Sequence, residues 1–587
     1  MSCKPLVRIN DVSAGNTAKR LVVVIPGMGS TYRDWKTLIT RIQQDPSNPV
    51  EQDDAPKLSY GSGEAHWMSF EHGIKVTTLG QRDLAQPGNL ETLSRQLRNL
   101  IHEQWVKYGK YEDVVLIGHS MGGLLARRVY LLAAGAVPGQ ESSPWGKQVS
   151  RIILFAAVNR GFRLDSLPPV QRFIAQIGMM FSRRIFYSED VLCGSDFITN
   201  LRIDWIRHFR AIEKRQPERL TGTTGPQTRV PLVVQFLGDQ EELITSEDNK
   251  DILAFPNGHY RSVACGNHGN LFRLEPDIAP DPDARYLILR EPFFSELSAM
   301  DTDDNRRPKE SPIKQIVMIL HGIRADRVDD WVGQIGKAIA KRDSSTTLVS
   351  APGYGYFTAL RFALPAERRR NIPTFRDEYT ELLAEHPEAK FSIIAHSNGT
   401  YMLGRSLRKT PGMRFENIVL AGSALPEDYD WEELMDLDAS HLRQVGRVMN
   451  ERASRDWPIA LLCNMLNGLP WKSMKDIGRG GYSGFRGDKV IEVAYHQGDH
   501  GRALKDDNQD RLVAFAFGED PRTITLPTDP GLFFRLSNFF HHIGLTLILV
   551  ILAVILLISF WGWVFHPVNA IVTAVVLIAL LLIVNSA

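Results

Sequence analysis

The sequence contains little cysteine for its length. Four cysteines occur in 587 residues, at Cys3, Cys193, Cys265 and Cys463, and no two of them form a C-x-x-C pair. Disulfide-rich secreted domains carry many cysteines at regular spacing, and thiol-redox sites carry the C-x-x-C pair. Both classes are therefore excluded, and reduced, mostly buried thiols in a cytosolic setting are expected.

The chain also lacks an excess of charge of either sign. Its 68 Lys and Arg residues nearly balance its 67 Asp and Glu residues, and the formal net charge is +1. A nucleic-acid-binding chain normally carries a basic excess, so no nucleic-acid partner is expected. The motifs GxxxxGK[ST] and HExxH are absent, which excludes the common nucleotide phosphate loop and the zincin centre. We expect no cofactor and no metal.

Long apolar runs are missing from the N-terminus but not from the C-terminus. Residues 1–8 contain no apolar core of a secretory signal peptide. Ile543–Phe565 is an uncharged run of about 23 residues, which as a helix would span about 34 Å and cross a hydrocarbon core of about 30 Å. A polar break at residues 566–569 precedes a second run, Ala570–Val584. Residues 543–584 are therefore predicted to form two transmembrane helices, a hairpin that anchors the chain to a membrane.

The charges around this hairpin predict its orientation. The short connection at residues 566–569 carries no Lys or Arg, whereas Arg535 precedes the first run. Positive residues favour the cytosolic side of a membrane. The chain before the hairpin is thus expected on the cytosolic face.

One stretch in the first half has the pattern of a nucleophile elbow. Val114–Ile117 is apolar and predicts a buried strand, Gly118-His119-Ser120-Met121-Gly122 predicts a tight turn, and Leu124–Leu132 predicts a helix. This strand–turn–helix context is the one that a G-x-S-x-G serine requires. The serine of such a turn is strained and crowded, which suits glycine on either side. Ser120 is therefore a candidate nucleophile.

A second copy of the pattern makes a chance match improbable. Phe391–Ile394 is again an apolar run, followed by Ala395-His396-Ser397-Asn398-Gly399. Ala395 replaces the first glycine but is still small. Ser397 is the second candidate nucleophile.

Apolar runs and amphipathic stretches alternate around the first elbow. This alternation predicts an α/β fold with a mostly parallel sheet covered by helices on both faces. The expected strands are Arg20–Ile25, Ile74–Leu79, Val149–Val158 and Val230–Leu237, and the expected helices are Trp35–Ile42 and Leu90–Tyr108. Asp45–Glu71 is expected to be an insertion or a loop.

The same order restarts after a polar linker, so two domains of one fold are expected in tandem. The predicted boundaries are residues 1–290 for the first domain, 291–312 for the linker and 313–530 for the second domain. The first domain contains a helical insertion at about residues 160–229. Its apolar segments, Phe173–Phe181 and Trp205–Ile206, fit either a lid that recognises acyl chains or an ordinary helical excursion packed on the core.

A serine becomes a nucleophile when a histidine accepts its proton and a carboxylate orients that histidine. With a G-x-S-x-G elbow, the acid and then the histidine follow later in the chain. In the first domain the acid is predicted to be Glu241, with Asp239 a close second. The histidine is predicted to be His268, with His259 as its rival.

The second domain offers the same three groups in the same order. Asp456 follows a predicted strand that begins near Gln444, and His500 follows the last predicted strand, Lys489–Ala494. His496 is the less well placed alternative. The second set of candidates is therefore Ser397, Asp456 and His500.

Developing charge on the substrate oxygen needs backbone N–H donors, each worth about 3 kcal/mol. One donor is expected from the residue after each serine, Met121 or Asn398. The other is expected from the turn after the first strand of each domain, at Met28 or Ile323.

These motifs resemble those of the α/β-hydrolase superfamily. The resemblance covers roughly residues 18–285 and 312–515, and the first half, through Ile25-Pro26-Gly27-Met28-Gly29, the Ser120 elbow and Asn267-His268-Gly269, is similar to lipase-like serine esterases. The resemblance implies a serine hydrolase that cleaves carboxylic esters through an acyl-enzyme. The predicted membrane hairpin and the lid interpretation of the insertion favour a membrane-anchored enzyme with lipid or acyl esters as substrates. Two alternatives stay open: one domain is catalytic and the other a binding module, or the chain is a toxin-like lipase that acts on a target membrane.

Overall fold

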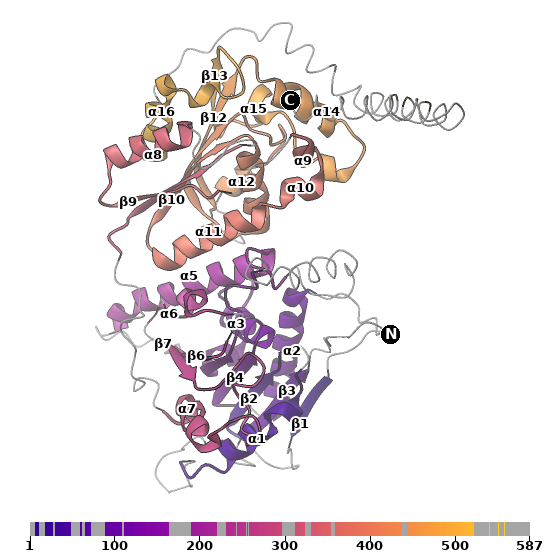
Figure 1. Ribbon diagram of the computed structural model, residues 1–587, viewed down its shortest axis with the longest axis vertical. Helices are drawn as coiled ribbons and strands as arrows, with labels where there is room; N and C mark the ends of the chain where they lie inside the picture. The colour runs from indigo at the N-terminus through magenta and orange to yellow at the C-terminus, as the bar shows by residue number, and fades with distance from the viewer. Residues whose placement is uncertain are drawn as a thin grey trace. The chain divides into compact units, whose positions relative to one another are not determined.

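The computed structural model divides the chain into two compact units (Figure 1). The first comprises residues 1–311 with 379–387, and the second comprises residues 312–378 with 388–587. The described residues are 6–10, 18–27, 30–47, 59–60, 65–71, 89–108, 111–163, 190–219, 230–241, 244–253, 255, 257–295, 311–322, 330–353, 359–436, 443–521, 539, 550, 554 and 557.

The first unit is built on a seven-stranded sheet with the order β1-β3-β2-β4-β5-β6-β7. Every neighbouring pair is parallel except β1 with β3. The central strands are almost wholly buried because apolar side chains point to both faces, as expected where helices cover both sides. The strands are β1 (Leu6–Asn10), β2 (Arg20–Ile25), β3 (Ala65–Glu71), β4 (Asp113–His119), β5 (Val149–Phe155), β6 (Leu232–Gly238) and β7 (Gly258–Val263).

Two groups of helices pack on this sheet. In one group α3 packs on β4 and is flanked by α2 and α5, and in the other α7 packs on β5 and β7 and contacts α1. The α3 helix is buried along its length and ends at Gly135, whose φ of 69° is the left-handed C-cap that glycine adopts without strain. The helices are α1 (Tyr32–Gln43), α2 (Leu90–Tyr108), α3 (Met121–Ala134), α5 (Asp196–Arg219), α6 (Lys250–Leu253) and α7 (Pro282–Phe294), with short helices η1 (Pro144–Gln148) and η3 (Ser246–Asn249).

One secondary-structure prediction for this unit was wrong. The stretch expected to be a loop up to Glu71 ends in strand β3, which lies between β1 and β2. Trp67, Met68 and Phe70 are buried, but the polar residues that precede the strand hid this apolar stretch. The strand expected at 74–79 lies outside the described residues.

The second unit has a six-stranded sheet with the order β13-β12-β11-β10-β8-β9, and all its pairs are parallel. In this sheet β10 lies between β8 and β11, as β4 lies between β2 and β5 in the first. The predicted α/β fold with two mostly parallel sheets is therefore confirmed. The strands are β8 (Gln315–Leu320), β9 (Thr347–Ser350), β10 (Lys390–His396), β11 (Phe415–Ala421), β12 (Val445–Ala453) and β13 (Val490–His496).

Helices again lie on both faces of the second sheet (Figure 1). On one face α16 packs on β10 and β11 and beside α8, while α12 follows β10 directly. The helices are α8 (Asp330–Arg342), α9 (Ala359–Ala363), α10 (Pro365–Arg369), α11 (Ile372–Glu385), α12 (Asn398–Lys409), α13 (Trp431–Met435), α14 (Asn464–Asn467), α15 (Gly480–Ser483) and α16 (Asp506–Ala516), with short helices η5 (Pro458–Cys463), η6 (Lys472–Met474) and η7 (Arg502–Leu504).

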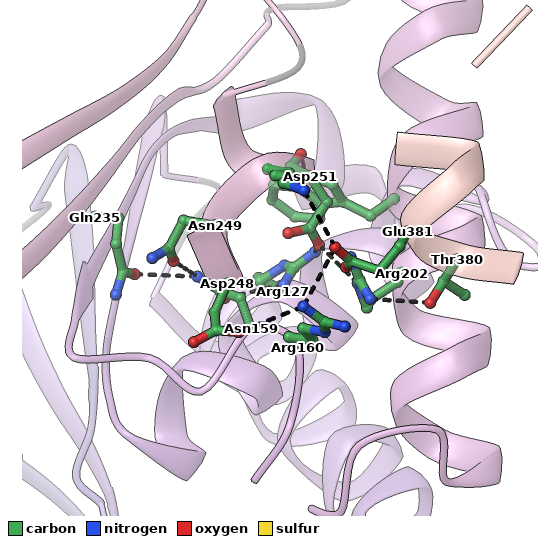
Figure 2. A network of polar contacts seen from close by, with 12 residues as sticks. Arg127, Asn159, Arg160, Arg202, Gln235, Asp248, Asn249, Asp251, Thr380 and Glu381 are labelled. Atoms are coloured by element: carbon green, nitrogen blue, oxygen red, sulfur yellow. Dashed lines mark hydrogen bonds and ion pairs between the residues drawn. The ribbon is translucent and has the colours of Figure 1, made fainter. Parts of the chain in front are cut away.

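A buried polar network joins α3, α5 and α6 in the first unit (Figure 2). Arg127 donates to Asp251 Oδ2 at 2.5 Å and to Asn159 Oδ1 at 2.9 Å. Asn159, which follows β5, donates in turn to Asn249 Oδ1 at 2.7 Å. Arg202 of α5 donates to Thr380 and Glu381 in the segment 379–387 of the same unit. The network ties together the segments that follow β5 and β6.

The insertion of the first unit contributes to this packing. Trp205 of α5 is fully buried, lies 4.4 Å below the Arg127 guanidinium and packs against Phe209. This part of the insertion is therefore core structure, and the apolar segment 173–181 lies outside the described residues.

The predicted membrane hairpin also lies outside them, apart from Val550, Val554 and Leu557. Among the residues that the structure describes, no helix is long and apolar enough to cross a bilayer.

Candidate active site

Ser120 occupies the turn between β4 and α3 in a strained backbone conformation. Its φ is 53° and its ψ is −121°, values that residues other than glycine rarely adopt. The backbone N–H of Ser120 donates to the Phe155 carbonyl at 2.9 Å. A Cβ on Gly122 would lie 2.1 Å from the Ile25 carbonyl oxygen, and one on Gly118 would lie 2.6 Å from that of Gly122. Both flanking glycines are thus required by close backbone packing.

The structure brings Ser120, His268 and Glu241 together. The Ser120 Oγ lies 2.9 Å from Nε2 of His268, and Nδ1 of His268 lies 3.2 Å from both carboxylate oxygens of Glu241. The carboxylate only accepts, so Nδ1 carries the hydrogen and Nε2 is free to accept the serine proton. The Glu241 side chain is 2% exposed and that of His268 is 23% exposed. The acid is therefore shielded from water while the imidazole remains accessible.

The two rival residues lie elsewhere. Asp239 is exposed, and its backbone N–H donates to the Val263 carbonyl. His259 is buried within β7, where it pairs with Val234.

A buried arginine that the sequence did not point to holds the His268 loop. Arg285 of α7 donates to four carbonyl oxygens, those of Ala264, Cys265, Asn270 and Arg273, at 2.9–3.2 Å. These carbonyls flank His268 on both sides in the chain. Contacts to backbone carbonyls leave no pattern in the side chains, so only the fold reveals this role.

Ser397 in the second unit has the same backbone conformation as Ser120. Its φ is 54° and its ψ is −120°, and its N–H donates to the Ala421 carbonyl at 3.0 Å. A Cβ on Gly399 would lie 2.6 Å from the Leu320 carbonyl oxygen. Ala395, where the first unit has Gly118, is fully buried in β10. The second elbow is therefore formed despite the alanine.

Asp456 and His500 form a buried pair in the second unit. The Asp456 Oδ1 lies 2.8 Å from Nδ1 of His500, and the Asp456 side chain is fully buried. Burial alone would lower the pKa of His500, but the charge and hydrogen bond of Asp456 outweigh it and raise that pKa above 6.5. Among the described residues, the buried Nε2 of His500 makes no hydrogen bond. The second unit thus pairs acid and base without a serine–histidine bond.

His496 belongs to a different cluster. Its Nε2 lies 2.6 Å from Oε2 of the fully buried Glu451, which also receives two hydrogen bonds from Arg511. The imidazole of His496 is therefore engaged by a cluster of side chains from β12 and α16.

Two of the four predicted oxyanion donors can be placed. Met121 and Asn398 are the first residues of α3 and α12, and both are buried. Backbone N–H groups at a helix N-terminus have no partner within the helix and favour negative charge. Met28 and Ile323 lie outside the described residues. No group of three or more candidate metal ligands occurs within the part of the chain that the structure describes.

Comparison with known proteins finds one family model that matches part of the first unit. Residues 22–283 match the model described as Alpha/beta hydrolase family. No curated protein matches the chain.

Solved structures similar to this chain include two archaeal esterases and a bacterial thioesterase. The esterase from Pyrobaculum calidifontis is 12% identical with a TM-score of 0.28, covering 49% of this chain and 78% of its own. The esterase Pf2001 from Pyrococcus furiosus is 12% identical with a TM-score of 0.25, covering 44% and 77%. The RedJ thioesterase of the prodiginine pathway in Streptomyces coelicolor is 17% identical with a TM-score of 0.26, covering 47% and 91%.

The second unit places its candidate residues as the first unit does. Ala156 and Gly422 follow the strand beside each elbow, both have positive φ, and both donate their N–H to the next strand, at Phe236 and Glu451. Glu241 and Asp456 each lie five residues after that acceptor. The acid thus has the same place in both sheets.

Proposed function

We propose that the chain is a serine ester hydrolase, and that the first unit is its principal catalytic domain. The observation that carries the proposal is the 2.9 Å contact between the Ser120 Oγ and Nε2 of His268, with Glu241 behind the imidazole. A strained serine, a histidine that can accept its proton and a buried carboxylate are the three groups that acyl transfer needs.

The reaction follows from the roles of these groups. The Ser120 Oγ attacks the acyl carbonyl carbon while His268 Nε2 takes the serine proton. Glu241 stabilises the imidazolium that forms, and the Met121 N–H stabilises the negative oxygen of the tetrahedral intermediate. Collapse expels the alcohol, which takes the proton from His268 and leaves an acyl-enzyme on Ser120. Water, deprotonated by His268, then releases the acid.

We further propose a second reaction centre at Ser397, Asp456 and His500. It is supported by the matching elbow geometry and the 2.8 Å acid–histidine pair. The donors proposed for its oxyanion are the backbone N–H groups of Asn398 and Ile323, as Met121 and Met28 are for the first centre.

The alternative is that the second unit binds a ligand and does not catalyse. It is favoured by one observation: His500 Nε2 makes no hydrogen bond among the described residues. Catalytic hydrogen bonds are often loose before substrate binds, and we therefore keep catalysis as the leading proposal.

The proposed substrates are lipid or acyl esters. This part rests on the apolar runs at 543–565 and 570–584, which would hold the chain at a membrane surface with its two units on the cytosolic face.

Hydrolysis of nitrophenyl esters of graded acyl length by four forms of the full chain tests the proposal. The forms are wild type, Ser120→Ala, Ser397→Ala and the double variant. We expect most activity to disappear with Ser120→Ala, the remainder to disappear in the double variant, and longer acyl chains to be preferred. Full activity in the double variant would refute the assignment of both nucleophiles. Complete loss with Ser120→Ala alone would favour the binding role for the second unit.

A further inference from the structure

The residue before each candidate nucleophile is a buried histidine that touches the backbone of the proposed general base. Nε2 of His119 lies 2.7 Å from the carbonyl oxygen of His268. Nε2 of His396 lies 3.4 Å from the carbonyl oxygen of His500. A carbonyl oxygen only accepts hydrogen bonds, so in both units Nε2 carries the hydrogen and donates it.

The other nitrogen of each imidazole, Nδ1, lies in a different environment. Nδ1 of His119 and Nδ1 of His396 are both buried and make no hydrogen bond among the described residues. A protonated Nδ1 would leave a buried donor without an acceptor. Burial lowers the pKa of His119 to about 4 and that of His396 well below 6.5. Both rings are therefore neutral at physiological pH.

In each unit a glycine lies close to this Nδ1 atom. A Cβ on Gly27 would lie 2.6 Å from Nδ1 of His119, and one on Gly322 would lie 2.9 Å from Nδ1 of His396. A Cβ on Gly27 would also lie 3.0 Å from the Cβ of Ser120, and one on Gly322 would lie 2.9 Å from the Cβ of Ser397. The glycine of the first-strand turn thus leaves room for both the imidazole and the serine.

Charge explains why a neutral donor belongs here. The ring of His119 is 5.5 Å from that of His268, and the ring of His396 is 4.6 Å from that of His500, centre to centre. A positive group at this distance would oppose the imidazolium that forms during acyl transfer. Neutral histidine supplies an N–H without that charge.

We propose that His119 and His396 are positioning residues that hold the main chain of the general base through a neutral Nε2–H donor, a role that rests on the proposed function. The units differ in the acid, Glu241 or Asp456, and in the first small residue of the elbow. They share the histidine, the carbonyl that its Nε2 contacts, the lack of a hydrogen bond to its Nδ1 among the described residues, and the glycine beside that Nδ1. Loss of the donor lets the His268 backbone shift away from Ser120, and displacement of about 1 Å lowers turnover by about 100-fold.

The test uses the full chain with Ser397→Ala, so that only the first site turns over. In this parent, His119→Gln keeps an amide N–H within reach of the carbonyl, and His119→Leu is a variant of similar size without a donor. His119→Phe lacks the donor but keeps a ring against Phe272, which the wild-type ring contacts at 4.9 Å. For each variant kcat, KM and the melting temperature are measured with one nitrophenyl ester.

A positioning role and a packing role for His119 predict opposite orders of kcat among the three variants. We expect kcat of the Gln variant to stay within about 3-fold of the parent and that of the Leu and Phe variants to fall about 10- to 100-fold, with KM unchanged. We expect the Phe variant to have the highest melting temperature of the three. A Phe variant as active as the parent, or activity that follows the melting temperature, would overturn the proposal.

An inactive Ser397→Ala parent would instead contradict the proposed function itself, so the two failures are distinguishable. The second unit provides an independent copy in the Ser120→Ala background. Because its histidine–carbonyl distance is 3.4 Å rather than 2.7 Å, His396→Leu should lower kcat less than His119→Leu does. A larger loss in the second unit would count against a role through this hydrogen bond.

Discussion

At the scale of single residues, two neighbouring carboxylates of the first unit have different surroundings. Glu241 is buried against His268, whereas Asp239 is exposed. We predict that Glu241→Gln lowers kcat by about 100-fold or more because the imidazolium loses its counter-charge and its tautomer is no longer fixed. Asp239→Asn is the matched control and should change kcat less than 2-fold. Equal losses in both variants, measured with Ser397→Ala as the parent, would remove Glu241 from its proposed role.

A second residue-scale prediction concerns Gly422. Its φ is 51°, and a Cβ there would lie 2.6 Å from Cε1 of His500. We predict that Gly422→Ala displaces His500, abolishes activity of the second site and costs about 1–3 kcal/mol of unfolding free energy. Ala156 holds the corresponding position in the first unit, and Ala156→Gly should leave the first site active. Urea unfolding and ester hydrolysis in the Ser120→Ala background measure the two effects of Gly422→Ala, and hydrolysis in the Ser397→Ala background measures the effect of Ala156→Gly. A fully active Gly422→Ala variant would contradict the proposed role of His500.

The raised pKa of His500 gives a pH prediction. Burial opposes the charged form, but Asp456, with help from Asp499, raises the pKa above 6.5. A general base must be neutral, so kcat/KM of the Ser120→Ala form should increase with pH through a midpoint above 6.5. Asp456→Asn should lower that midpoint along with the rate. A midpoint below 6.5 in the Ser120→Ala form would show that His500 is not the titrating base.

The same shift affects folding. A histidine whose pKa is higher in the folded than in the unfolded state stabilises the fold fully below the unfolded value, and this stabilisation is lost as the pH increases through the folded value. The second unit should therefore lose some stability between about pH 6.5 and the raised pKa of His500.

At the scale of elements, the His268 loop depends on a helix that is far from the elbow along the chain. Arg285 of α7 donates to four carbonyls of this loop. We predict that Arg285→Leu lowers first-site kcat at least 10-fold and destabilises the first unit by about 2–4 kcal/mol, because buried carbonyls lose a charged donor. Arg290→Leu is the control on the same helix, since Arg290 pairs with Asp45 rather than with the loop; it should lower stability without lowering kcat. Similar kcat losses in both variants would show that α7 matters only for folding.

Elements with a strong periodic pattern could be predicted from the sequence, and those without one could not. The expected strand Arg20–Ile25 and helix Leu90–Tyr108 have the same bounds in the structure. Strand β3 was missed because it follows polar residues, and β1 and β7 because their polar positions interrupt the apolar pattern. The contacts of His119 and Arg285 with backbone carbonyls depend on chain segments more than 10 residues away. No local pattern could have revealed them.

At the scale of the whole molecule, the chain combines two proposed reaction centres with two apolar runs at residues 543–565 and 570–584. We predict that the full chain sediments with membranes and resists alkaline carbonate extraction, whereas a chain ending at residue 530 stays in the supernatant and keeps its activity toward short nitrophenyl esters. The physical reason is that two uncharged runs of this length partition into hydrocarbon. Carbonate extraction of the full chain into the supernatant would contradict the membrane anchor without affecting the proposed chemistry.

The central claim is that Ser120 is a nucleophile activated by His268. Mass spectrometric mapping of the adduct formed with a fluorophosphonate tests it most directly, because the reagent reacts covalently with an activated serine. We predict an adduct on Ser120 in the wild-type chain. In the His268→Ala variant we expect this adduct to form at least about 100-fold more slowly. A chain that forms no adduct on Ser120, or an adduct that forms equally fast without His268, would contradict it.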